Sequence, residues 1–192
     1  MKKIGLTGVI GSGKTTAAEY FKYLGIPVFI ADESAKNLMT NNSEIKRSII
    51  KLLGSDAYIN GNLNKEFISN KIFYDLDLLK SINAFVHPLV HEDFVLWVSK
   101  QNSKYVIYEA ALIFENNSQS YFDKIICIKT PIELIHDRLK TRENYSKMRI
   151  NKILSLQIPQ DVKCSKSDFC IKNISRDELL SELNSIHLSL LA

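Results

Sequence analysis

Short apolar runs alternate along the chain with longer stretches whose apolar residues recur at helical spacing. The runs predict strands at residues 4–7, 27–31, 105–109, 124–129 and 169–172. The longer stretches predict helices over residues 14–24, 66–74, 76–102, 132–142, 146–157 and 177–191. Strands that are apolar throughout and alternate with helices are typical of a parallel sheet covered by helices. The pattern therefore predicts an α/β fold.

Two residues predict where helices end. Gly25 suits the left-handed conformation that often follows a helix, so the first helix should end there. Pro88 lacks a backbone N–H and clashes with the preceding turn, so it should break or kink the stretch 76–102, which we expect to be two helices. Residues 32–104 separate the second and third strands, whereas one crossover needs about a dozen residues. We therefore expect one domain over residues 1–192, with an inserted helical lobe over about residues 33–103.

Composition limits the function classes only loosely. The chain has 192 residues, of which 45% are hydrophobic, enough for one domain with its own core. The net charge of +4 permits phosphate-bearing ligands, but the basic residues form no tail that would indicate nucleic acid. No apolar run approaches the length that spans a membrane, and the first residues lack the apolar segment of a secretory signal. We expect a cytoplasmic protein that binds neither membrane nor nucleic acid.

The cysteines are expected to be reduced. Cys127, Cys164 and Cys170 include no CxxC pair, and an odd number fits a disulfide framework poorly. Cys127 lies in an apolar run, which favours buried packing over chemistry.

The segment Gly8-Val9-Ile10-Gly11-Ser12-Gly13-Lys14-Thr15 matches the Walker A pattern between a predicted strand and a predicted helix. Glycines let successive backbone N–H groups point at phosphate oxygens, and the following helix adds the positive end of its dipole. Lys14 should reach the β- and γ-phosphates, and the Thr15 hydroxyl should ligate Mg²⁺. The sequence therefore predicts a site for ATP and Mg²⁺, formed by Gly8, Gly11, Ser12, Gly13, Lys14, Thr15 and Thr16.

This loop alone does not identify the reaction. GTPases also carry an Asn-Lys-x-Asp motif, and the nearest segments here, at residues 64–67 and 151–154, lack the Asp. Motor and transporter ATPases need a longer chain. A small kinase fits the length, and it needs an acceptor site and a lid.

Candidates for both lie downstream. Asp32 closes the second predicted strand, at the edge of an α/β sheet where ligands bind, and can orient an acceptor hydroxyl. Alternatively, it caps the next helix, over residues 33–39. Arg138 and Arg142 follow the fourth strand and can stabilise charge on a transferred phosphoryl group. Alternatively, they belong to a solvated helix surface.

Marks spread over the chain resemble the dephospho-CoA kinase family. They are Leu6-Thr7-Gly8 with the loop, Leu24-Gly25, the strand ending in Ala31-Asp32, Ile72-Phe73, His87-Pro88, residues 112–115, Arg138 with Arg142, Gln157, and residues 167–173. The resemblance implies a P-loop kinase fold with a five-stranded parallel sheet, a helical lobe on the substrate side and a lid over about residues 138–160. It also implies phosphorylation of the ribose 3′-hydroxyl of dephospho-CoA by ATP.

The resemblance assigns roles to individual residues. Asp32 becomes the candidate base, and His87 belongs to the substrate side. Arg142 becomes the lid arginine with Arg138 beside it, and Asn173 falls on the adenine side. The catalytic candidates are thus Lys14, Asp32, Arg138 and Arg142.

The chain departs from the family pattern at a few positions. Val9 replaces a usual glycine, which requires a negative φ there, and Ala111 replaces a proline. Glu109 stands where Asp is frequent, His136 where Gln is usual, and Lys163 where Arg is usual. Two other functions remain open: another nucleoside or nucleotide kinase, and a nucleotide-binding module without catalysis. No pattern encodes an oligomeric state, and a monomer is our default expectation.

Overall fold

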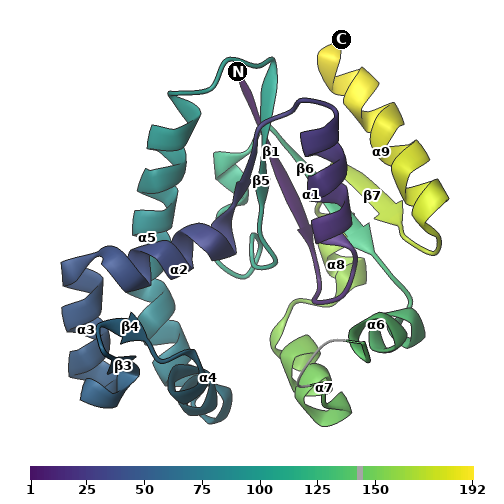
Figure 1. Ribbon diagram of the computed structural model, residues 1–192. Helices are drawn as coiled ribbons and strands as arrows, with labels where there is room; N and C mark the ends of the chain where they lie inside the picture. Colours follow the sequence, from purple (N-terminus) through teal and green to yellow (C-terminus); the bar gives the residue numbers. More distant parts are fainter. Residues whose placement is uncertain (142–144) are drawn as a thin grey trace. The chain divides into compact units, whose positions relative to one another are not determined.

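The computed structural model describes residues 1–141 and 145–192, with the backbone alone for Tyr74 and Leu76. The chain divides into two compact units. The sheet unit combines residues 1–30 with residues 101–192, and the inserted unit comprises residues 31–100. In Figure 1 the inserted unit is coloured from blue to teal.

The sheet unit is built on five parallel strands in the order β2-β5-β1-β6-β7. Their bounds are Lys2–Gly8 (β1), Val28–Ile30 (β2), Tyr105–Glu109 (β5), Lys124–Lys129 (β6) and Phe169–Lys172 (β7). The parallel α/β fold expected from the alternating pattern is confirmed. The carboxyl end of the central strand β1 leads directly into the segment with the Walker A pattern.

Helices cover both faces of this sheet. On one face, α1 (Lys14–Tyr23) and α9 (Arg176–Leu191) pack against each other and against Leu6, Ile126 and Ile128. Successive side chains of a strand point to opposite faces, so Ile125 packs on the other side, with Ile113 and Phe114. There α8 (Gln160–Ser165) lies against β6 and β7. The described residues of the sheet unit also form the α-helices α6 (Ile132–Leu139) and α7 (Lys147–Leu156).

The inserted unit is mainly helical. It contains α2 (Ala31–Asn41), α3 (Ser43–Leu53), α4 (Lys65–Tyr74) and α5 (Leu76–Val98), with a hairpin of β3 (Tyr58–Ile59) and β4 (Asn62–Leu63). Side-chain oxygens of Asn42, Asn64 and Asp75 accept hydrogen bonds from the first-turn N–H groups of α3, α4 and α5. These caps explain why the helices begin where they do.

The expected break at Pro88 is wrong, because α5 continues through this residue. A proline inside a helix costs about 3 kcal/mol. Apolar side chains spaced four residues apart on both sides of Pro88 are buried, namely Ile82, Val86, Val90 and Phe94. This continuous buried stripe offsets the lost hydrogen bond and keeps the helix in one piece.

The expectation of reduced cysteines is also wrong, because Cys164 and Cys170 form a disulfide, with 5.2 Å between their Cα atoms. The two residues are six positions apart, at the end of α8 and within β7, so a short turn brings them together. Cys127 is buried and unpaired. Within the described residues, no helix is long and apolar enough to cross a bilayer.

Candidate active site

The segment from Gly8 to Lys14 forms a tight loop between β1 and α1. Gly8 approaches its neighbours so closely that an added Cβ would lie 2.5 Å from the carbonyl oxygen of Ile128. Gly13 has a φ of 101°, and an added Cβ would lie 2.2 Å from the Nδ2 atom of Asn173. Neither position has room for a side chain, so the glycines of the pattern are required by this loop's geometry.

Val9 fits the loop although it replaces a glycine. Of the described residues other than glycine, only Asn60 and Asn117 have a positive φ, so Val9 meets the condition set by the sequence. Its side chain is buried against Ile135 and Leu139 of α6 and Ile150 of α7. The departure thus adds apolar contact between the loop and the two helices that follow β6.

The loop is suited to bind phosphate. The Lys14 ammonium lies 3.1 Å from the carbonyl oxygen of Gly8 and 3.2 Å from that of Val9, across the loop's own backbone. The first turn of α1 carries no acidic side chain, so nothing offsets the positive end of the helix dipole. In the described part of the chain, the Ser12 Oγ atom is buried without a hydrogen-bond partner. A positive lysine, a free helix N-terminus and an unsatisfied hydroxyl together fit an anionic ligand.

One edge of the loop is held by residues that follow β6 and β7. The Ser12 carbonyl accepts hydrogen bonds of 2.8 Å from the Thr130 hydroxyl and from the Asn173 amide. Arg138 donates to the Asn173 side chain at 3.2 Å and to the Ile174 carbonyl at 3.3 Å. The structure therefore brings Arg138 and Asn173, both predicted as site residues, together beside Gly13. In these contacts Arg138 orients Asn173.

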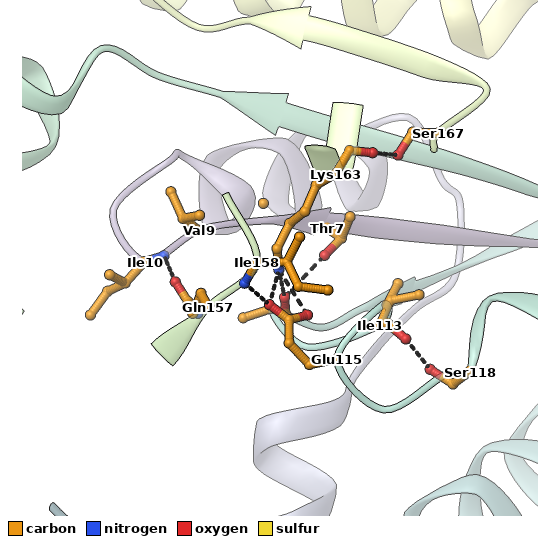
Figure 2. A network of polar contacts seen from close by, with 12 residues as sticks. Thr7, Val9, Ile10, Ile113, Glu115, Ser118, Gln157, Ile158, Lys163 and Ser167 are labelled. Carbon is orange, nitrogen blue, oxygen red and sulfur yellow. Dashed lines mark hydrogen bonds and ion pairs between the residues drawn. The ribbon is translucent and has the colours of Figure 1, made fainter. Parts of the chain in front are cut away.

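The other edge of the loop is held by residues that follow α7 and β5. The Ile10 N–H donates to Gln157 Oε1 at 3.0 Å, and the Thr7 hydroxyl donates to the Ala111 carbonyl at 3.2 Å. Figure 2 shows the Ile10–Gln157 contact and, apart from it, the contacts of Lys163, whose side chain is fully buried. Sequence reasoning treated Lys163 only as a substitute for an arginine and gave no role to Thr130. The sequence points to these two residues only by their positions: Thr130 directly follows β6, and Lys163 precedes β7.

Asp32 and His87 belong to the inserted unit. Asp32 is exposed and lies in the first turn of α2, so it does not occupy the N-cap position of a helix that starts at residue 33. Partial burial lowers the pKa of His87 below its usual value, and the Asp32 carboxylate partly offsets this shift. Because these two groups interact, the structure brings the two predicted acceptor-side residues together.

The remaining predicted residues stand as follows. Thr15 and Thr16 lie in the first turn of α1, where Thr15 is exposed. Glu109 is buried at the end of β5, beside Leu6 of β1. Arg142 lies outside the described residues. Within those residues no group of three or more His, Cys, Asp or Glu is placed to hold a metal. Mg²⁺ in kinases takes few protein ligands and several phosphate oxygens, so an exposed hydroxyl beside Lys14 fits it.

Comparisons with known proteins point to one family. The family model described as dephospho-CoA kinase matches residues 2–178. A protein of Bacteroides fragilis named dephospho-CoA kinase is 30% identical over 182 residues, covering 94% of this chain and 89% of its own. A protein of the same name from gamma-proteobacterium EBAC31A08 is 34% identical over 187 residues, covering 96% and 94%.

Solved structures agree on the fold. The protein TT1252 of Thermus thermophilus superimposes with a TM-score of 0.87 at 26% identity, covering 100% of this chain and 98% of its own. Dephospho-CoA kinase from Campylobacter jejuni gives a TM-score of 0.62 at 22% identity, covering 98% and 97%, and shares the fold. A shikimate kinase from Bacteroides thetaiotaomicron gives a TM-score of 0.56 at 13% identity, covering 100% and 99%, and also shares the fold.

Proposed function

The chain belongs to the dephospho-CoA kinase family, and on that premise we propose that it transfers the γ-phosphoryl group of ATP to the ribose 3′-hydroxyl of dephospho-CoA. The observation that carries this proposal is the phosphate loop, with Lys14 over its backbone and an orphaned Ser12 hydroxyl, in a chain whose family match covers residues 2–178.

On the donor side, the loop binds and orients the triphosphate. The N–H groups at the N-terminus of α1 attract the phosphate oxygens, and Lys14 leaves the carbonyls of its own loop to contact the β- and γ-phosphates. Mg²⁺ supplies charge neutralisation when bound, and Thr15 is the residue that would ligate it. Arg142, by its place in the family pattern, adds positive charge beside the transferred group.

On the acceptor side, Asp32 accepts a hydrogen bond from the 3′-hydroxyl and orients its oxygen for attack. The P–O bond to the new ester forms as the bond between the γ-phosphorus and the β–γ bridging oxygen breaks. ADP leaves, and the hydroxyl proton passes to solvent through the carboxylate. His87, whose pKa is lowered by burial, is neutral at pH 7 and can donate or accept a hydrogen bond beside Asp32.

The deciding experiment is an acceptor assay. Purified protein is incubated with ATP and Mg²⁺ and either dephospho-CoA or a panel of nucleosides and nucleotides, and products are identified by mass. We expect one added phosphoryl group on dephospho-CoA alone. Turnover restricted to the nucleotide panel would assign the chain to another kinase activity, and ATP binding without any turnover would make it a binding module.

We further propose that the enzyme works as a monomer in the cytoplasm. Size-exclusion chromatography with light scattering should give the mass of one chain, 21.9 kDa. A stable dimer, or fractionation of the tagged protein outside the cytoplasm, would overturn this part without affecting the assigned reaction.

A further inference from the structure

A buried ion pair lies under the phosphate loop and takes no part in the reaction proposed above. The side chain of Lys163, in α8, is completely buried, and that of Glu115 is 15% exposed. The Lys163 ammonium lies 2.7 Å from Glu115 Oε1, 3.0 Å from Oε2 and 2.5 Å from the Ala111 carbonyl oxygen. An ammonium removed from water needs such a full set of acceptors, because an unpaired buried charge costs several kcal/mol.

Both acceptors of the ammonium have second partners that lead to the phosphate loop. The Ala111 carbonyl also accepts from the Thr7 hydroxyl in β1, one residue before Gly8. The Glu115 carboxylate also accepts from the Ile158 N–H at 2.8 Å. Figure 2 shows Ile158 next to Gln157, whose side chain accepts the Ile10 N–H. Two routes of direct contacts therefore join one buried charge to the two ends of the segment Thr7–Ile10.

Stability alone does not account for this arrangement. A buried ion pair is often no more stabilising than apolar side chains of the same volume. What an apolar pair cannot do is fix three separate backbone segments in one geometry. The Lys163 ammonium contacts residues 111 and 115, and through them it holds the α7–α8 junction and the carboxyl end of β1.

The junction between α7 and α8 also affects the packing of Val9 in the phosphate loop. α7 ends at Leu156, one residue before Gln157, and Ile150 of α7 packs against the Val9 side chain. A shift of the junction would therefore move both the acceptor of the Ile10 N–H and the apolar support of Val9. Both changes fall on the part of the loop that curls around phosphate.

We propose that Lys163 and Glu115 are positioning residues for ATP, which preorganise the phosphate loop through Gln157 and Thr7. This inference rests on the proposed ATP-dependent kinase activity and adds a specific support for it. A loop that must be ordered by the ligand binds it more weakly, whereas a bound ligand still reacts in the ordered loop. The expected signature is a change in ATP affinity with little change in turnover.

The test uses the full-length enzyme and four variants. Lys163→Met with Glu115→Gln removes both charges and keeps the volume, so no unpaired charge stays buried. Gln157→Met removes only the acceptor of the Ile10 N–H and leaves the ion pair intact. A triple variant combines them. Lys166→Met is the matched control, because Lys166 is an exposed lysine three residues further along the chain.

The measured quantities are the dissociation constant for ATP by calorimetry, the KM for each substrate and kcat. In the double variant and in Gln157→Met we expect ATP affinity to fall about tenfold, the size of one lost hydrogen bond in a network, with kcat within about threefold. The KM for dephospho-CoA should not change. The triple variant should lose less than the product of the two effects, because both act through the same contacts.

Several outcomes would overturn the inference. The first is an ATP affinity within about twofold of wild type in the double variant and in Gln157→Met. The second is a loss of ATP affinity in the triple variant equal to the product of the two separate losses. The third is an equal loss of ATP affinity in Lys166→Met. If the double variant does not fold, ATP affinity within about twofold of wild type in Gln157→Met still overturns the inference, because the loop would then not depend on the Gln157 contact. If the wild-type enzyme binds ATP but does not phosphorylate dephospho-CoA, the proposed function fails, and the calorimetric comparison still tests the support of the loop.

Discussion

Lys14 contacts the carbonyl oxygens of Gly8 and Val9, which belong to the loop that it would serve. Backbone carbonyls are weaker partners for an ammonium than phosphate oxygens, so a triphosphate can displace them at little cost. These contacts therefore hold the residue close to its working position.

The first prediction concerns this residue. Lys14→Ala should reduce kcat by about 10²–10³-fold, because it removes a preorganised positive charge facing the transferred group. The fold should be retained, since Lys14 is only half-buried, and circular dichroism with thermal unfolding checks this. Activity near the wild-type level would mean that the phosphates lie elsewhere.

The second prediction concerns Asp32. Asp32→Asn should lower turnover by about 10²-fold or more, because the amide cannot accept the hydroxyl proton, while ATP affinity changes little. Steady-state kinetics together with ATP calorimetry separates the two effects. Loss of ATP binding instead of turnover would give Asp32 a metal-linked or structural role.

The third prediction follows from the electrostatic contact between Asp32 and His87. Burial lowers the pKa of His87 and Asp32 raises it in part, so Asp32→Asn should lower that pKa further. The unfolded chain takes up this proton near pH 6.5. The contribution of His87 to the free energy of unfolding is therefore fully present above about pH 6.5. It is lost as the pH decreases toward the folded-state pKa, because the unfolded state binds more protons in this range.

Asp32→Asn should steepen this loss of stability below pH 6.5, and His87→Gln should remove the contribution of this residue. Proton NMR titration of His87 and urea unfolding between pH 5 and 8 measure both effects. A higher pKa of His87 in Asp32→Asn would contradict the contact.

At the scale of elements, the short elements α8 and β7 position two residues that support the phosphate loop. α8 has six residues and β7 has four, yet Lys163 lies on the first and Asn173 directly follows the second. The Cys164–Cys170 disulfide joins them. Two short elements that hold opposite edges of the phosphate loop are thus covalently linked.

The fourth prediction concerns this link. Reduction, or the Cys164→Ser variant, should lower the free energy of unfolding by about 2 kcal/mol, the loop-closure contribution of so short a ring. Cys127 should not react under the same conditions, because burial raises the pKa of its thiol to about 11. Thermal unfolding with and without dithiothreitol, with thiol counting, measures both. Insensitivity of the wild-type protein to reductant would show that the link does not form in solution.

At the scale of the whole molecule, the order of elements was predictable and their pairing was not. Residues 125–128, the interior of the strand β6, are all apolar, so the type of this element follows from the sequence. The neighbours of β1 are β5 and β6, and Lys2 pairs with Tyr105, a contact no local pattern encodes. The helix α3 was missed, although Ile45 and Ile49 lie on one buried face.

The site was predictable to the same extent. The loop from Gly8 to Thr15 can be recognised in the sequence, because its glycines, lysine and threonine are required at fixed spacing. The residues that hold the loop in place cannot be recognised in this way. Lys163 stands among Asp161, Ser165 and Lys166, which read as a solvated helix surface, and only the tertiary fold shows that its side chain is fully buried. Thr130 and Glu115 likewise acquire their partners from distant segments.

The division of the sheet unit between two stretches of chain has a consequence for biosynthesis. Residues 1–30 emerge from the ribosome first, but the partners of β1 and β2 lie beyond residue 104, after the inserted unit is complete. Domains generally fold as units while the chain is being made. The inserted unit should therefore become protease-resistant in stalled chains before residues 1–30 do.

ATP should protect nascent chains from proteolysis only once Asn173 has emerged, because the Ser12 carbonyl lacks one of its donors until then. Stalled chains of increasing length, digested with and without ATP, would reveal this order, and early protection of residues 1–30 would refute it. The phosphate loop would thus become functional only long after its own residues have been made.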